Sequence, residues 1–233
     1  MSKRKRRGQC AFCGSSGDVT TDHVPPKGIY GKPVPPDAIT VRACAACNTK
    51  SKEDDQYLKR VLAMSSATDQ HPEAWRIKAE THRDLDRPES RAFIQATARR
   101  SRDVFLDTDN QHRLVYAPTF DYNRKRMKRS VIKIARGLYA HFSGRPLGKS
   151  AFIGTLSLAE IDEKAPDVAA TLWDMVAFAM ASEHLTIRSG AFEAWYYLPA
   201  DHPDHGIWVT AFYGAFPFVT SHWPTDDDGE TAS

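Results

Sequence analysis

The segments CAFC (residues 10–13) and CAACN (residues 44–48) decide how the first part of this chain folds. They hold all four cysteines of the chain as two CxxC pairs. Two such pairs supply the four thiolate ligands of a tetrahedral zinc site and leave no thiol over. Two disulfides or an iron centre would use the same residues, but a reducing compartment favours a metal over disulfides. The motif therefore predicts a closed, structural zinc site on Cys10, Cys13, Cys44 and Cys47.

The composition is that of an ordinary soluble globular protein. The 233 residues are 41% hydrophobic and 26% charged. No apolar stretch approaches the roughly 20 residues that span a bilayer. The basic run at residues 3–7 is followed by a cysteine pair and not by the apolar segment of a signal peptide. We expect a cytoplasmic protein that does not contact membranes.

Charge is unevenly distributed along a chain whose net charge is only +3. Residues 3–7 are all basic, residues 122–159 contain no acidic residue, and residues 226–230 are mostly acidic. Local basic patches on a nearly neutral chain suit a polyanionic partner. Solvated helix faces and frayed termini are the alternative explanation for each of these patches.

Hydrophobic periodicity predicts a mixed chain of the α+β class. Proline and glycine between the cysteine pairs favour a rigid loop. We predict strands at residues 39–41 and 114–116, helices from about residue 51 and at residues 90–102, 122–142 and 166–182, and a long hairpin between residues 192–198 and 207–218.

The predicted organisation has four parts. They are a basic disordered tail (1–9), a zinc-containing module (10–65), a mostly helical accessory domain with C-terminal strands (66–224) and an acidic tail (225–233). The expected fold is thus a small zinc-stapled module joined to a helix-rich body with a C-terminal β-hairpin.

The order of motifs in residues 10–60 resembles the HNH endonucleases, the ββα-metal nuclease fold, in their zinc-stapled form. Five features appear in the family's order: the first cysteine pair, Asp22-His23, a proline-rich loop, the second cysteine pair and Asn48. The resemblance covers about a quarter of the chain. It implies a ββα-metal nuclease module within residues 10–65.

The resemblance also implies roles for individual residues. His23 would be the general base, and Asp22 and Asn48 would bind one catalytic divalent ion, Mg²⁺ or Mn²⁺. Imidazole titrates near neutral pH, and carboxylate and amide oxygens are ligands that Mg²⁺ accepts. Hydrolysis of a DNA phosphodiester bond would leave 5′-phosphate and 3′-hydroxyl ends. Asp37 stands where the family has an asparagine that braces the loop near the base, and we expect its carboxylate to accept backbone hydrogen bonds there.

Two features of the segment after Asn48 leave alternatives open. Lys52 stands where many members of the family have a histidine, so Lys52 or Lys50 is a candidate contact to the substrate phosphate. Asp54 and Asp55 either lend a carboxylate to the metal or are first-turn acids of the following helix, where the helix dipole stabilises a negative charge.

Nucleic acid, foremost DNA, is the expected partner, with a second copy of the chain or another protein as a further option. Phosphate contacts supply much of the affinity of such complexes. The predicted contacts are Lys27, Arg42, Lys50 and Lys52 of the module and Arg129, Lys133 and Arg136 of the amphipathic helix at residues 122–142. The alternative function is a non-catalytic zinc module that binds nucleic acid or protein.

Overall fold

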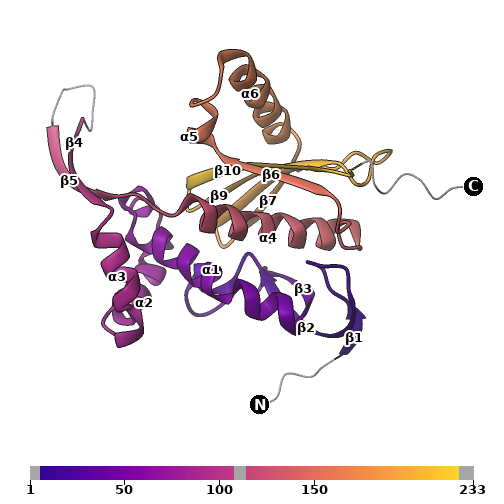
Figure 1. Ribbon diagram of the computed structural model, residues 1–233, viewed down its shortest axis with the longest axis horizontal. Coiled ribbons are helices and arrows are strands. Elements are labelled where there is room, and N and C mark those ends of the chain that lie inside the picture. Colours follow the sequence, from indigo (N-terminus) through magenta and orange to yellow (C-terminus); the bar gives the residue numbers. More distant parts are fainter. Residues whose placement is uncertain (1–5, 108–113, 226–233) are drawn as a thin grey trace, which may run out of the picture.

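The computed structural model describes residues 6–107 and 114–225 (Figure 1). Residues 1–5 of the predicted basic tail and residues 226–233 of the predicted acidic tail lie outside the described residues. The prediction of a disordered tail is wrong for residues 6–9. Arg6–Gln9 form strand β1, because their backbone pairs antiparallel with residues 16–19.

The N-terminal part is a three-stranded antiparallel sheet followed by a long helix. Strand β2 (Ser16–Val24) lies between β1 and β3 (Ile39–Cys44). The short 3-10 helix η1 (Lys27–Tyr30) lies in the proline-rich loop between β2 and β3. Helix α1 (Ala45–Met64) begins directly where β3 ends. The strand predicted at residues 39–41 is therefore confirmed, and it extends to the second cysteine pair.

Helix α1 begins at Ala45 and not near Ser51, where hydrophobic periodicity placed it. Its N-cap is Cys44, whose sulfur accepts a hydrogen bond from the backbone N–H of Cys47. Cysteine is not among the residues that usually mark a helix start, so the sequence carried no such signal. Asn48 consequently lies in the first turn of α1, while the acids at residues 54 and 55 lie in the third turn, and the first-turn alternative for them is wrong.

A helical segment and a hairpin follow. The elements are η2 (Ser66–Thr68), α2 (Ala74–Leu85), η3 (Pro88–Ser90), α3 (Arg91–Ala98), β4 (Ser101–Asp107) and β5 (Leu114–Phe120). Strands β4 and β5 pair antiparallel and project away from the rest of the molecule (Figure 1). The helix predicted at residues 90–102 therefore ends early, and the strand predicted at residues 114–116 is confirmed.

The C-terminal part is built on a five-stranded antiparallel sheet in the order β6-β10-β9-β8-β7. The strands are β6 (Phe152–Ser157), β7 (Glu183–Ile187), β8 (Phe192–Tyr197), β9 (Gly206–Phe212) and β10 (Ala215–Trp223). Pairing of β8 with β9 confirms the predicted hairpin, but the prediction of a helix-rich body with only that hairpin is wrong. Segment 207–218 turns at Tyr213 and Gly214, both with positive φ, and returns as a further strand.

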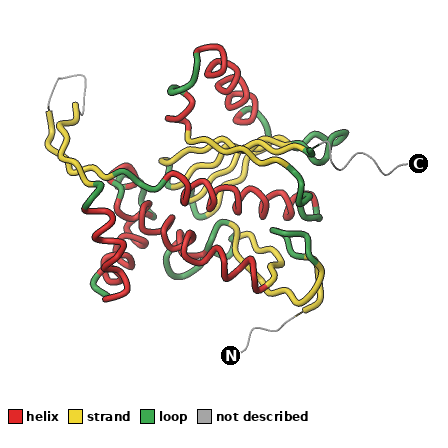
Figure 2. Tube along the Cα trace, viewed as in Figure 1, coloured by secondary structure: helices red, strands yellow, loops and turns green. Residues whose placement is uncertain are grey.

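Helix α4 (Arg124–Ser143) lies between this sheet and the N-terminal part (Figures 1 and 2). Helices α5 (Leu158–Ile161) and α6 (Pro166–Met180) lie on the opposite face of the sheet (Figure 1). The helices predicted at residues 122–142 and 166–182 are thus confirmed. Within the described residues, no helix combines the length and the apolar character that crossing a membrane requires.

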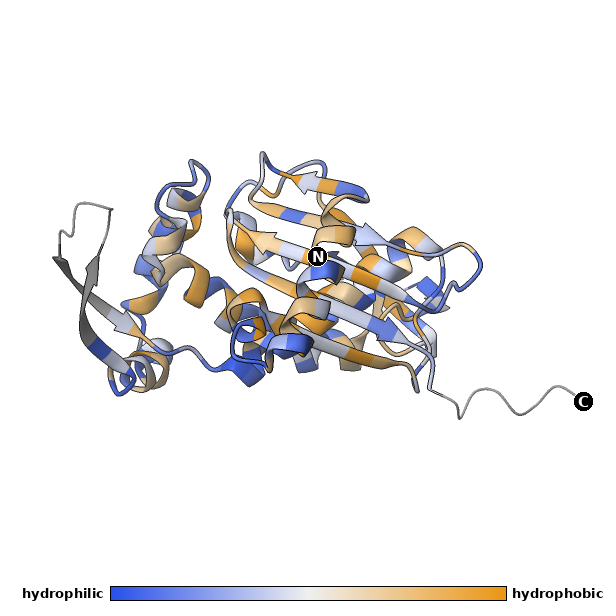
Figure 3. Cartoon of the chain, turned by 90° about the horizontal axis from the view of Figure 1, so that it is seen from above, coloured by the Kyte–Doolittle hydropathy of each residue, from blue (hydrophilic) through white to orange (hydrophobic). Residues whose placement is uncertain are grey.

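One continuous core joins the N-terminal part to the sheet. It contains Val24 and Leu58 from the N-terminal part, Leu138 from α4, and Trp208 and Phe212 from β9, all of them buried. Hydrophobic segments gather on the sheet and on the helices packed against it, while the loops are largely hydrophilic (Figure 3). The core therefore runs across the boundary predicted between residues 65 and 66.

Gly137 marks the closest approach of α4 to the N-terminal part. A Cβ atom added there would lie 2.5 Å from Val24 Cγ2. Replacing a helix glycine by alanine normally stabilises a helix by about 1 kcal/mol. We expect Gly137→Ala instead to lower the free energy of unfolding by roughly 1–3 kcal/mol in urea titrations, because overpacking outweighs helix propensity.

The double variant Gly137→Ala/Val24→Ala is the control, because it removes the two nearest atoms that an alanine at position 137 would meet and leaves only Phe12 Cε1 at 3.2 Å. The double variant should lose less free energy of unfolding than the sum of the losses in the two single variants. Additive effects, or a Gly137→Ala variant more stable than the wild type, would contradict the close packing of α4 on β2.

Candidate functional site

The four cysteines lie together at one end of the N-terminal sheet. Their Sγ atoms all lie within 4.8 Å of one another, and Cys13 Sγ is 3.8 Å from Cys44 Sγ. All four are free thiols. Cys10 and Cys13 come from the turn between β1 and β2, and Cys44 and Cys47 come from the junction of β3 with α1. This cluster could hold a metal ion such as zinc, as the CxxC spacing predicts.

Burial and hydrogen bonding change the proton affinities of these thiols in the metal-free cluster. Burial raises the pKa of Cys10 and the pKa of Cys47. The hydroxyl of Ser15 lowers the pKa of Cys13 to about 6. A bound divalent ion takes thiolates, so it would replace the thiol protons that the buried cluster otherwise retains.

A cation lies next to this cluster. The guanidinium of Arg136 donates to the backbone oxygens of Leu147 and Gly148 at 3.4 and 3.3 Å. Burial lowers the pKa of Arg136, and the charges of Cys13 and Cys47 oppose that shift. Arg136 therefore faces the thiolate cluster, and it does not project into solvent as a nucleic-acid contact.

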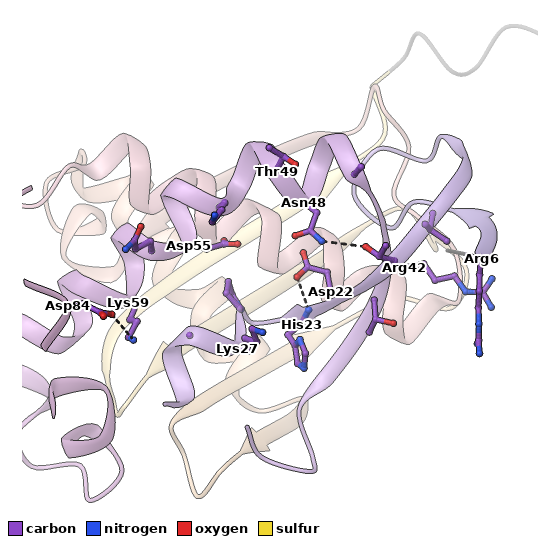
Figure 4. Close-up of a pocket in the computed structure, with 18 residues that line it drawn as sticks. Arg6, Asp22, His23, Lys27, Arg42, Asn48, Thr49, Asp55, Lys59 and Asp84 are labelled. Carbon is purple, nitrogen blue, oxygen red and sulfur yellow. Dashed lines mark hydrogen bonds and ion pairs between the residues drawn. The ribbon is translucent and has the colours of Figure 1, made fainter. Parts of the chain in front are cut away.

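Strand β2 also borders a large open cleft. It has a volume of about 1130 Å³ and is lined by β2, η1, β3 and α1 (Figure 4). Asp22, His23 and Asn48 all line it, as do Lys27 and Arg42. The cleft thus unites the residues to which the family resemblance gives catalytic roles.

Asp22 and Asn48 offer two oxygens on the same side of the cleft. Asp22 Oδ1 accepts a hydrogen bond from the His23 backbone N–H at 2.9 Å, while Oδ2 is buried and makes no hydrogen bond within the described residues. Asn48 Nδ2 donates to Thr20 Oγ1 at 3.5 Å, which turns the amide oxygen toward the side of the Asp22 carboxylate (Figure 4). A carboxylate and an amide oxygen are hard ligands that suit Mg²⁺ or Mn²⁺, so this donor set fits such an ion.

The ring of His23 lies on the other side of the strand from the Asp22 carboxylate (Figure 4). Neighbouring residues of a strand point to opposite faces, yet both Asp22 and His23 are among the residues that line the cleft.

Asp37 is tied to the C-terminal sheet. Its carboxylate accepts a hydrogen bond from the backbone N–H of Arg188 at 3.1 Å, and the Arg188 side chain donates to the backbone oxygen of Tyr30 at 2.7 Å. Asp37 thus accepts a backbone hydrogen bond as expected, but its donor belongs to the turn between β7 and β8 and not to the proline-rich loop itself.

The structure separates the predicted nucleic-acid contacts into two groups. Lys27, Arg42, Lys50 and Lys52 are exposed and make no ion pair within the described residues. Arg129 pairs with Asp54 at 2.7 Å. On α4, Arg129 is thus paired with an acid of α1 but remains exposed, whereas Lys133 and Arg136 are partly buried.

Lys133 is the clearest correction within this group. Its Nζ lies 2.8 Å from Asp55 Oδ2 and 3.1 Å from Asp22 Oδ2, and its side chain is only 10% exposed. Burial raises the pKa of Asp55, and Lys133 opposes that shift. Lys133 is thus a buried member of the site and not a surface contact.

Asp55 is the site residue to which the sequence gave no definite role. It lies seven residues after Asn48, close to two helical turns, so a helix that starts at Ala45 presents both residues on one face. Asp22, Asn48 and Asp55 converge in Figure 4. With the start of α1 at Ala45, the seven-residue spacing from Asn48 would have predicted that Asp55 also faces the site.

Comparison with known proteins adds no name to this site. No family model, no curated protein and no solved structure matches the chain.

We expect the purified protein to hold one zinc ion per chain and Cys44→Ser to lose it. This variant removes a ligand but keeps a hydrogen-bond acceptor at the N-cap of α1, so loss of zinc would report the missing thiolate and not a missing cap. Metal analysis and a colorimetric zinc-release titration measure the effect. Ser15→Ala is the matched control, since it removes a neighbouring hydroxyl but no ligand. Full zinc occupancy in Cys44→Ser would contradict the four-cysteine site.

Proposed function

We propose that this protein is a metal-dependent endonuclease of the HNH type that hydrolyses DNA phosphodiester bonds. The observation that carries the proposal is the convergence of Asp22, His23 and Asn48 on one open cleft beside a four-cysteine cluster. In this proposal the cluster holds a structural zinc ion, and the cleft holds one Mg²⁺ or Mn²⁺ ion. Free thiols of this kind suit a reducing compartment such as the cytoplasm.

Each side chain has a definite task in the proposed reaction. Asp22 and Asn48 would hold the divalent ion, which when bound stabilises the negative charge that develops on the phosphate and on the leaving oxygen. His23 would take a proton from the attacking water on the opposite side. In-line displacement requires the attacking and leaving oxygens to lie on opposite sides of the phosphorus atom, so in this proposal the base and the ion would act on opposite sides of the phosphate.

The cations that border the cleft would hold the DNA backbone. Lys27 comes from η1, Arg42 from β3 and Lys52 from α1, and all three line the cleft. None of them makes an ion pair within the described residues, so binding a phosphate would break no existing salt bridge. The phosphates would release counterions, which makes this binding sensitive to salt.

We expect His23→Ala to keep its zinc content and its far-UV circular dichroism and to lose cleavage of plasmid DNA by about 10²-fold or more. Asn48→Ala should weaken activation by Mn²⁺, and excess Mn²⁺ should partly restore the rate. His71→Ala replaces a histidine outside the cleft and serves as the control. Undiminished cleavage by His23→Ala would refute the base assignment.

Plasmid DNA, single-stranded DNA and RNA should be tested in parallel with Mg²⁺ and Mn²⁺. If the zinc-loaded protein binds them in gel-shift assays but cleaves none, the non-catalytic binding module is favoured over the nuclease.

Salt dependence distinguishes the two groups of cations. We expect Lys27→Gln/Arg42→Gln to weaken DNA binding and to reduce the slope of log Kd against log salt by roughly 1–2. Arg129→Gln, which removes a cation already paired with Asp54, should leave that slope unchanged. Fluorescence anisotropy at several salt concentrations measures both. A reduced slope in Arg129→Gln alone would place the interface on α4.

A further inference from the structure

The ammonium group of Lys133 lies between two carboxylates from different elements. Asp22 belongs to β2 and Asp55 belongs to α1, and both lie within ion-pair distance of Lys133 Nζ. The face of the Phe12 ring closes a third side, with its centre 5.2 Å from Nζ. Lys133 itself belongs to α4, so a helix outside the HNH-like segment contributes a buried cation to the proposed metal site.

The two carboxylates do not hold the ammonium equally. Asp55 Oδ2 accepts a hydrogen bond from Lys133 at 2.8 Å, and it also accepts one from Ser51 Oγ at 3.3 Å. Asp22 Oδ2 lies 3.1 Å from Lys133, but the contact does not have hydrogen-bond geometry and the oxygen is otherwise without a donor. Lys133 is therefore held more closely by Asp55 than by Asp22, and among the described residues Asp22 Oδ2 has only this longer ion pair, while Asp55 Oδ1 makes no hydrogen bond.

We propose that Lys133 competes with the divalent ion for the Asp22 carboxylate and that Asp55 limits this competition by binding Lys133. This inference rests on the function proposed above. An ammonium fully paired with Asp22 would compete with the ion and repel it, because like charges interact strongly where solvent is scarce. Asp55 gives the ammonium a second partner, which weakens its hold on Asp22 and leaves that carboxylate able to take the ion. In this scheme Asp55 acts through Lys133 and does not bind the ion.

A double-mutant cycle on Mn²⁺ affinity tests this scheme. Asp55→Asn should weaken Mn²⁺ binding roughly tenfold, because the released ammonium then pairs with Asp22. Lys133→Met should strengthen Mn²⁺ binding roughly tenfold, because the competing charge is gone. Asp55→Asn/Lys133→Met should bind Mn²⁺ within about threefold of the wild type, since it removes one charge of each sign. Isothermal titration calorimetry on zinc-loaded protein measures all four affinities.

Matched variants separate this effect from a general loss of structure. Asp54→Asn/Arg129→Met removes a salt bridge between the same two helices and should not change Mn²⁺ affinity. Lys133→Arg keeps the charge and should bind Mn²⁺ nearly as the wild type does. If Lys133→Met does not fold, Lys133→Gln replaces it, because its amide still donates to Asp55. Zinc content and far-UV circular dichroism verify the fold of each variant.

The outcomes distinguish this inference from the proposed function. If Asp22→Ala leaves Mn²⁺ binding unchanged, both are overturned. If Asp22→Ala abolishes Mn²⁺ binding and the double variant remains as weak as Asp55→Asn, then Asp55 is itself a ligand and only this inference is overturned. Recovery of affinity in the double variant, together with tighter binding by the Lys133 variant, supports it.

Discussion

The junction of β3 with α1 carries two of the four clustered cysteine sulfurs, and the geometry of the cleft depends on this junction. Cys44 ends the strand and caps the helix, and Cys47 lies in the first turn. Because a helix turns by about 100° per residue, a shift of one residue at this start would rotate Asn48 and Asp55 away from β2. A metal ion on the cluster would fix that rotation, so a site without open coordination positions would still orient the side chains that line the cleft. Its contribution to function is orientation.

Helix α4 connects this junction to the rest of the molecule through two different kinds of contact. Its apolar side, including Leu138 and Tyr139, is buried in the core, and Gly137 allows close approach to β2. Its basic side meets the acids of α1 and the thiols of the cluster. Partly buried ion pairs add little net stability compared with apolar packing, but removing one partner leaves an unpaired charge and is costly. These ion pairs therefore determine the orientation in which α4 docks more than they contribute to the free energy of docking.

The sequence predicted the residue types of the site well and its wider surroundings poorly. The CxxC spacing and the Asp22-His23 and Asn48 positions are local features of short segments, and the structure brings them to one cluster and one cleft. The basic side of α4 was misjudged, because amphipathic periodicity shows that Lys133 faces away from the apolar core but not that α1 presents two acids to it. Strands β6 and β7 escaped prediction for a similar reason: they are short and carry polar residues, and their place in the sheet is set by pairing with strands far along the chain. Contacts of long sequence separation leave no periodic pattern.

The hydrogen bond between Asp37 and Arg188 gives the proline-rich loop a support from the far end of the polypeptide. Arg188 and Ser189 both adopt left-handed backbone conformations, with φ of 48° and 49°, and this strained turn is what presents the Arg188 N–H to the loop. A fragment cut at the edge of the recognisable motif would therefore lose a brace located more than a hundred residues downstream. A segment that ends near residue 65, moved onto another scaffold, would need an equivalent support for this loop, because part of the loop's rigidity comes from Arg188.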